Sequence, residues 1–341
     1  MEILKAGIDR HAEGETAMRC LCCGKEIKEN ASAIERQSGW HKRCIRKFFG
    51  TEYIPRIELT EEAIQALANK TVNKGLTVPG VQKKMSLHLT AGKDSRLTLV
   101  NYPTGFILKP QTEEYGNLPE YEQMTMLMAE AVGIQVVPHG LIKVDDRFAY
   151  ITKRIDRHII RGKADLLAME DFCQLAGRQT VDKYKGSYEI CGKIIKKYSS
   201  YIGFDLSEFF LRIVFSFAVG NSDMHLKNFS LIEEAPGSRV FKLSAAYDML
   251  PVNVILPSDK EQTALTVHGK KRNIRRKDFM FLADSCGISE KAAGNLMESV
   301  LRRKEKLEQI CRQSQLSKIQ REQVLTLMEE RMKVLGQSQR K

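Results

Sequence analysis

The sequence predicts an α+β fold with two domains, in which strands gather in the first half and helices in the second. The length of 341 residues suits two domains and a small appendage. Residues 85–89 and 106–110 have the alternating or short apolar patterns of strands, and residues 148–157 predict an edge strand that runs into a charged connector. From Asp165 onward the patterns are mainly helical.

Charge and hydrophobicity limit the functional classes. The net charge of +12 favours anionic partners, such as nucleotides or nucleic acid, without choosing among them. No apolar run is long enough to span a bilayer, and the N-terminus lacks the apolar stretch of a signal peptide. We therefore expect a cytoplasmic protein without membrane association. Residues 1–18 predict a tail, and either Met1 or Met18 can be the start.

Two pairs of metal-ligating residue types lie near the N-terminus. Cys20 and Cys23 form a Cys-x-x-Cys pair, and His41 and Cys44 form a His-x-x-Cys pair at a spacing typical of zinc fingers. Three thiolates and one imidazole would close a tetrahedral structural Zn²⁺ site, with Cys22 left over and no open position for catalysis. The alternative is a set of unrelated thiols in a basic loop.

A short helix and a loop follow the cysteine-rich segment. Pro55 marks a boundary, and Thr60 is the predicted N-cap of a helix over residues 60–69. The turn at Pro79-Gly80 then leads into the first strand. Backbone N–H groups of this loop can meet phosphates, but the loop is not a Walker A motif.

Lys109 ends an apolar strand and precedes a helix with acidic residues. A buried ammonium group needs an anionic partner. Pro119 lies near the first turn of the helix and Gly133 near its end, with Glu120 and Glu122 in the first turn. A snorkelling lysine and a plain packing helix are the alternatives.

The stretch from Gly220 to Asn228 places an Asp five residues before an Asn. Asp223 and Asn228 follow an apolar helix that is predicted to open at Ser207. Asp248 comes later, after a predicted hairpin turn at Pro236-Gly237. Protein kinases use an Asp, an Asn five residues on and a later Asp for phosphoryl transfer. This order favours a phosphotransferase.

Several ordered motifs together resemble the HipA family of bacterial toxin-like serine/threonine kinases over roughly residues 60–290. These motifs are Thr77–Lys84, Phe106–Pro110, Leu118–Glu122, Lys153–Arg157, Glu170–Cys173, Gly220–Ser230 and Tyr247–Leu250. The resemblance implies a two-lobed, protein-kinase-like fold. A small sheet-containing N-lobe (56–157) would precede a helical C-lobe (158–341). The tail (1–18) and a zinc-knuckle-like segment (19–55) would come first.

The resemblance also implies roles for individual residues. Asp223 would be the catalytic base, and His225 would support its loop or approach the phosphates. Asn228 and Asp248 would hold Mg²⁺. ATP would be bound by the remaining residues, which are Lys109 with Glu122 as its partner, Thr77, Val78, Gly80, Val81, Gln82, Lys83 and Lys84 in the phosphate loop, and Lys153 and Ile155 in the hinge. Thr77 would be a self-phosphorylation site that inactivates the kinase.

Substrate and partners follow from the same resemblance. The acceptor would be a protein hydroxyl, with an aminoacyl-tRNA synthetase or another translation factor as the candidate. A helix-turn-helix antitoxin, or a small protein that replaces a missing N-terminal subdomain, would be the partner, and DNA would be reached only through the antitoxin. The alternatives are a catalytically inactive regulator that binds an antitoxin or nucleic acid, and a small-molecule kinase.

Overall fold

The computed structural model describes residues 17–57, 84–90, 96–98, 105–144, 146–160 and 163–337. The predicted helix of residues 60–69 lies outside these ranges. So do residues 1–16 of the predicted tail and, within the predicted phosphate loop, residues 77–83. Lys84 is the residue of that loop that the structure describes.

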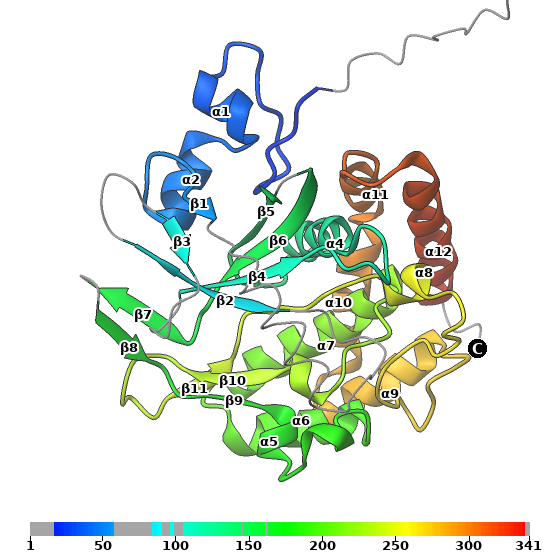
Figure 1. Ribbon diagram of the computed structural model, residues 1–341. Helices are drawn as coiled ribbons and strands as arrows, with labels where there is room; N and C mark the ends of the chain where they lie inside the picture. Colours follow the sequence, from blue (N-terminus) through cyan, green and yellow to red (C-terminus); the bar gives the residue numbers. More distant parts are fainter. Residues whose placement is uncertain are drawn as a thin grey trace, which may run out of the picture.

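A six-stranded sheet forms the first layer of the molecule (Figure 1). Its strand order is β1-β3-β2-β4-β6-β5, and the pairs are antiparallel except β1 with β3. The strands are β1 (Arg56–Ile57), β2 (Met85–Leu89), β3 (Arg96–Thr98), β4 (Phe106–Pro110), β5 (His139–Val144) and β6 (Arg147–Lys153).

The prediction of an edge strand at residues 148–157 is wrong. β6 pairs on one side with β4, where Lys153 faces Phe106, and on the other side with β5, where Thr152 faces His139. β6 is therefore an internal strand, buried on most of its length. The charged residues that follow it belong to the connection into the helical lobe and do not indicate an exposed edge.

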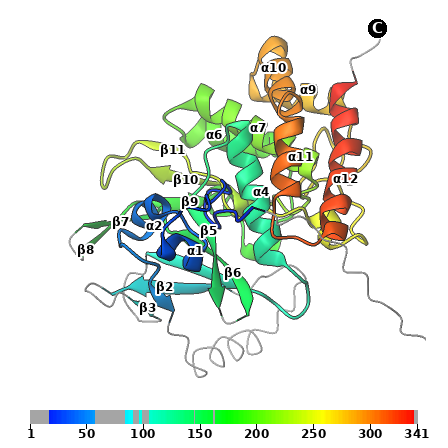
Figure 2. The same cartoon turned by 90° about the horizontal axis from the view of Figure 1, so that it is seen from above.

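Helix α4 (Leu118–Val132) packs against β5 and β6, and Figure 2 shows it between the sheet and α11. Pro119 lies in the first turn, where a backbone N–H has no helical carbonyl to bond. The missing N–H of proline therefore costs no hydrogen bond at this position. Gly133 closes the helix with a φ of 95°, a left-handed conformation that favours glycine. These two predicted boundaries are confirmed.

The N-terminal cysteine-rich segment is docked on the sheet. It carries α1 (Ala33–Ser38) and α2 (Lys42–Phe49), and α1 begins with a capping box between Ser32 and Glu35. The fully buried Trp40 donates its indole N–H to the Leu141 carbonyl of β5 at 2.8 Å. The Leu141 N–H in turn bonds the Leu21 carbonyl at 2.9 Å. One side chain and one backbone carbonyl of the segment thereby cover part of strand β5.

The second layer is mainly helical and centres on α7, which contacts α4, α6, α9, α10 and α12 (Figures 1 and 2). Two small sheets accompany it, and the predicted Pro236-Gly237 turn joins β10 to β11 as expected. The elements of this layer are β7 (Arg157–Ile160), β8 (Lys163–Leu166), β9 (Met169–Asp171), α5 (Phe172–Leu175), the 3-10 turn η1 (Thr180–Asp182), α6 (Tyr188–Tyr198), α7 (Ile202–Val219), the 3-10 turn η2 (Leu226–Asn228), β10 (Ser230–Glu233), β11 (Phe241–Leu243), α8 (Val252–Ile255), α9 (Arg276–Cys286), α10 (Glu290–Leu301), α11 (Lys304–Arg312) and α12 (Lys318–Gly336).

The predicted start of α7 at Ser207 is wrong by about a turn and a half. The helix begins at Ile202, and the Ser207 hydroxyl donates to the Gly203 carbonyl at 2.9 Å inside it. This bond one turn back satisfies the hydroxyl in the helix interior. A serine ahead of an apolar run therefore led to the prediction of an N-cap at a position inside the helix.

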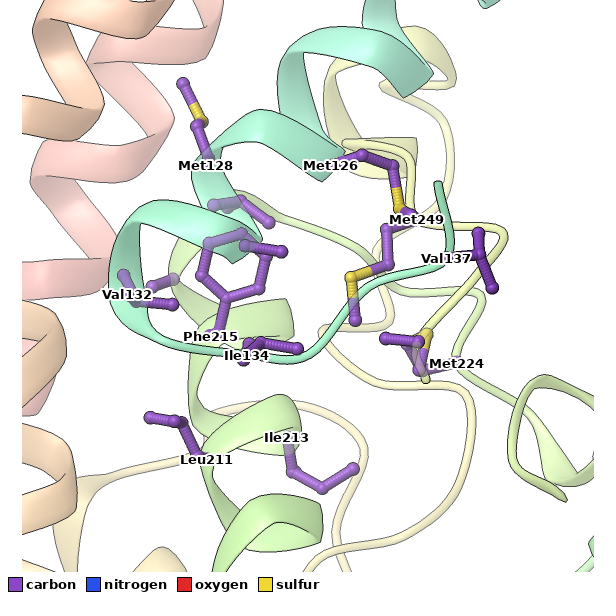
Figure 3. Packing of buried hydrophobic residues seen from close by; sticks show 14 of the residues in the cluster. Met126, Met128, Val132, Ile134, Val137, Leu211, Ile213, Phe215, Met224 and Met249 are labelled. Atoms are coloured by element: carbon purple, nitrogen blue, oxygen red, sulfur yellow. The ribbon is translucent and has the colours of Figure 1, made fainter. Parts of the chain in front are cut away.

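The two layers share an apolar core between α4 and α7 (Figure 3). Met126 of α4 and Phe215 of α7 are fully buried there, together with Met224 and Met249 from two loops. Each of these loop methionines directly follows an aspartate that the sequence singles out. The core therefore anchors both loops beside their carboxylates.

Among the described residues, no helix combines the length and the apolar character that crossing a bilayer requires.

Candidate active site

A cavity of about 460 Å³ lies between the sheet and the helical layer. Its walls combine apolar side chains with lysines and carboxylates, as expected of a site for a charged small molecule. The sheet and the segments that adjoin its strands contribute Lys84, Ile107, Lys109, Val137, Thr152, Lys153, Arg154, Ile155 and Asp156. The helical layer contributes residues that include Met169, Lys183, Asn221, Asp223, His225, Asn228, Tyr247, Asp248 and Leu250.

Lys109 of β4 lies between two carboxylates. Its ammonium group donates to Glu122 of α4 and to Asp248 of the loop after β11. Lys109 is 2% exposed and Glu122 is fully buried. Burial opposes the charge of Lys109, but the carboxylates of Asp248 and Glu122 outweigh it and raise the lysine pKa. Burial also raises the pKa of Glu122, to about 7, against the pull of Lys109.

Glu120 has a different partner. It accepts a hydrogen bond from the Asn117 amide at 2.9 Å. Of the two carboxylates considered from the sequence, the structure therefore brings Glu122 to Lys109. The role of this pair in binding ATP stays a prediction.

Asp248 is held in a strained backbone conformation. Its φ of 57° lies in the left-handed region, which is costly for a residue with a Cβ. The next residue, Met249, is buried in the core, and the Ala246 N–H on the other side bonds the Gln135 carbonyl at 2.7 Å. Lys84 also bonds the Asp248 carboxylate at 2.5 Å. Although burial opposes it, the charges of Lys109 and Lys84 hold the pKa of Asp248 well below its usual range.

The loop that carries Asp223 starts where α7 ends. Gly220 terminates the helix with a φ of 74°, and a Cβ there would lie 2.2 Å from the Leu327 side chain of α12, so that both the backbone and the packing favour glycine. The turn η2 then folds Asn228 back, and its side-chain amide donates to the Asp223 carbonyl at 2.9 Å. This contact explains the spacing of five residues between the two side chains.

Asp223 itself lines the cavity. Burial raises the pKa of its carboxyl, and a hydrogen bond from the Tyr184 hydroxyl at 2.6 Å opposes the rise. His225 follows in the same loop, and burial lowers its pKa to about 4. At neutral pH this imidazole is uncharged, so it can donate one hydrogen bond and accept another but cannot act as a cation.

The predicted hinge residues Lys153 and Ile155 line the same cavity at the end of β6. Burial lowers the pKa of Lys153, whose Nζ lies 6.0 Å from the ring centroids of Phe48 and Phe106. Next to them, Arg154 forms a bidentate ion pair with Asp156, with 2.9 Å between Nε and Oδ1 and 2.7 Å between Nη2 and Oδ2. The roles of Lys153 and Ile155 toward a nucleotide stay predictions.

Sequence reasoning missed two parts of the site. One is the segment with Lys183 and Tyr184, directly after the turn η1. The other is the ion pair between Lys227 and Asp171, at 2.6 Å, which joins the Asp223 loop to β9. A tyrosine between two lysines matches no motif with a fixed spacing to Asp223, so only the fold reveals that the two residues are in contact.

The predicted zinc ligands form a second cluster, in the N-terminal segment. One ligand atom from each of Cys20, Cys23, His41 and Cys44 lies within 4.8 Å of the others. The His41 Nε2 lies 3.0 Å from the Glu26 carbonyl, which favours a proton on Nε2 and leaves Nδ1 free, 3.4 Å from the Cys23 sulfur. This donor set fits a closed tetrahedral Zn²⁺ site.

Cys22 lies beside this cluster but has a separate structural contact. Its carbonyl accepts a hydrogen bond from Gln123 of α4 at 2.9 Å, and the other end of that amide meets His139 of β5 at 2.7 Å. The cysteine-rich segment is thereby tied to the helix that carries Glu122.

Residues 76–307 match the family model described as HipA-like C-terminal domain. The chain belongs to this family. Curated relatives of this HipA-like chain include a Haemophilus influenzae protein named "Putative kinase", 29% identical over 71% of this chain and 76% of that protein. Another is "Putative kinase Y4dM" of Sinorhizobium fredii, 32% identical over 63% of this chain. The match spans 54% of that relative, about half of its length.

Solved structures support the HipA-like fold. A HipA of Shewanella oneidensis, solved with HipB and operator DNA, has a TM-score of 0.64 at 19% identity, over 77% of this chain and 67% of that one. The Helicobacter pylori proinflammatory kinase CtkA has a TM-score of 0.51 at 15% identity, over 73% and 90% of the two chains. At these identities the likeness concerns the fold, and it confirms the predicted two-lobed, kinase-like architecture.

Proposed function

We propose that this protein is an ATP- and Mg²⁺-dependent protein serine/threonine kinase of the HipA type, which transfers the γ-phosphate to a protein hydroxyl. The observation that carries the proposal is the placement of Lys109, Asp223, Asn228 and Asp248 around one cavity, with Glu122 paired to Lys109 behind its wall. Kinases use a lysine–glutamate pair, a base and two metal ligands for this reaction. The two curated relatives described as kinases support the same activity.

Asn228 and Asp248 fit the requirements of Mg²⁺. Their oxygens are the ligand type that this ion prefers. The Asn228 NH₂ group is already bonded to the Asp223 carbonyl, which leaves its amide oxygen free to accept a metal. When bound, Mg²⁺ would neutralise phosphate charge. Lys84 and Lys109 both form ion pairs with the Asp248 carboxylate. We expect Lys84 to give up its ion pair when Asp248 binds the ion.

Asp223 would act on the acceptor hydroxyl. The carboxylate takes the hydroxyl proton as the acceptor oxygen bonds the γ-phosphorus and the bond to the β-phosphate oxygen breaks. Lys109, held by Glu122, would bind the phosphates. The apolar wall of Ile107, Val137 and Leu250 is suited to a nucleobase.

We further propose a helix-turn-helix antitoxin as a partner. The solved Shewanella HipA is in a complex with HipB and operator DNA, which supports this proposal. DNA would be contacted only through the antitoxin. A small partner protein other than the antitoxin is a second candidate. The substrate would be a protein, with an aminoacyl-tRNA synthetase as the candidate, and the site of action the cytoplasm.

Incubation of dephosphorylated protein with Mg-ATP tests the kinase activity. We expect intact-mass spectrometry to show the gain of a phosphate, because the site holds the groups for transfer and the chain supplies hydroxyls. Calorimetry should show saturable binding of Mg-ATP. Protein that binds no nucleotide and transfers no phosphate, to itself or to added protein, would favour a catalytically inactive regulator.

The variant Thr77→Ala is expected to lose most self-phosphorylation. Thr77 lies outside the described residues, and the expectation rests on its place in the predicted phosphate loop. A phosphate adds about two negative charges and would repel ATP. Peptide mapping after incubation with Mg-ATP measures the loss, with Thr90→Ala, a residue after β2, as the control. Full labelling of Thr77→Ala at other residues would reject this site.

A further inference from the structure

The turn η1 and the residues after it brace the Asp223 loop. The Leu226 N–H bonds the Lys183 carbonyl at 3.1 Å, which joins the two segments through their backbones. Tyr184 comes next in the chain, and its hydroxyl donates to Asp223 Oδ1 at 2.6 Å. Its ring meets the His225 ring edge-on, with centroids 5.0 Å apart. One residue therefore touches two members of the loop.

The backbone and the side chain of Asp223 are held by different groups. Asn228 bonds the Asp223 carbonyl at 2.9 Å, and the Asp223 N–H reaches the Asn221 side chain at 3.3 Å. These contacts fix the backbone but leave the carboxylate free to rotate. Among the side chains that the structure describes, Tyr184 is the hydrogen-bond donor to that carboxylate, and it uses Oδ1 alone.

We propose that Tyr184 is a positioning residue, whose hydroxyl fixes one oxygen of Asp223 so that the other faces the acceptor hydroxyl. This inference rests on the kinase function proposed above. A base is efficient only when its orientation is fixed, because small misplacements can lower a rate by about 100-fold. The short bond from a phenol to a carboxylate is of the strong, charge-assisted kind.

The Tyr184 hydroxyl is suited to donate a hydrogen bond at every pH of an assay. Burial and the nearby charge of Asp223 raise the pKa of its phenol far above the ordinary value, so that it keeps its proton throughout an assay range. Lys183 lies with its ammonium group 4.9 Å from the centre of the Tyr184 ring. A protonated phenol cannot accept the proton that Asp223 takes, so the two residues have separate roles.

The test compares Tyr184→Phe with wild type in ADP release and self-labelling at saturating Mg-ATP, and in the binding of Mg-ATP by calorimetry. Phenylalanine keeps the ring and removes the hydroxyl. We expect kcat to fall by about 10- to 100-fold, with the Kd of Mg-ATP changed by less than about twofold. The matched control is Tyr201→Phe, which removes a hydroxyl bonded to Glu234 at 2.8 Å on the surface. It should leave both quantities unchanged.

The outcomes separate this inference from the kinase function. A wild type that transfers no phosphate defeats the kinase function and the positioning role together. An active wild type and a Tyr184→Phe variant with unaltered kcat overturn the positioning role alone. So does a lower kcat with an equal loss of Mg-ATP affinity, or a variant that no longer unfolds cooperatively on heating, since either would assign Tyr184 a structural role.

Discussion

Replacement of Asp223 with asparagine should lower phosphoryl transfer by about 10²- to 10⁴-fold, the usual contribution of a general base. The amide has nearly the same shape and can still accept the hydrogen bond from Tyr184 at the position of Oδ1. It cannot take the proton of an acceptor hydroxyl. Binding of Mg-ATP should persist, because Lys109, Asn228 and Asp248 are unchanged.

Intact-mass spectrometry over time with Mg-ATP measures this effect. Asp165→Asn is a suitable control, since it removes an exposed carboxylate of β8 that is not among the cavity residues. The control should label at the wild-type rate. Residual transfer by Asp223→Asn above about a tenth of the wild-type rate would reject Asp223 as the base.

Loss of a zinc ligand should destabilise the sheet-containing layer. We expect about one Zn²⁺ per chain in the purified protein, and its loss in Cys44→Ser, because three ligands no longer close the site. Trp40, Phe48 and Phe49 would then lose the fold that holds them against β5 and Phe106. The unfolding midpoint should fall by about 5–10 °C.

Elemental analysis and thermal unfolding check this prediction together. Cys22→Ser is the matched control, since it alters a thiol in the same turn that is not among the four clustered ligands. It should keep both the metal and the midpoint. Folded wild-type protein without metal, and with the same midpoint after chelation, would show that the cluster is a set of thiols in a basic segment.

Much of the candidate site could be predicted because its residues occur in fixed local spacings. Asp223 and Asn228 are linked by a single turn, so their separation in the sequence reflects a direct contact. Lys109 at the end of a strand likewise needed a buried acid, and Glu122 supplies it. Local geometry of this kind leaves a pattern in the chain.

Contacts between distant segments leave no such pattern. Tyr184 reaches Asp223 across 39 residues, and Trp40 reaches Leu141 across 101. The charged residues after β6 favour an edge strand in the sequence, whereas β6 pairs with β4 on one side and β5 on the other. Ser207 was predicted to cap a helix, but its hydroxyl bonds the Gly203 carbonyl one turn back within α7. Tertiary contacts decided the first three cases, and a local bond within α7 decided the last.

The contact between Gly220 and α12 bears on where this domain ends. The match with the family model stops at residue 307, before α12 begins at Lys318. Yet Leu327 of α12 fills the space where a Cβ on Gly220 would lie, and Arg331 bonds the Asn253 side chain at 3.1 Å. A fragment cut at the homology boundary would keep every catalytic candidate and expose the start of their loop to water. The unit that folds is therefore expected to extend beyond the segment that matches the family model.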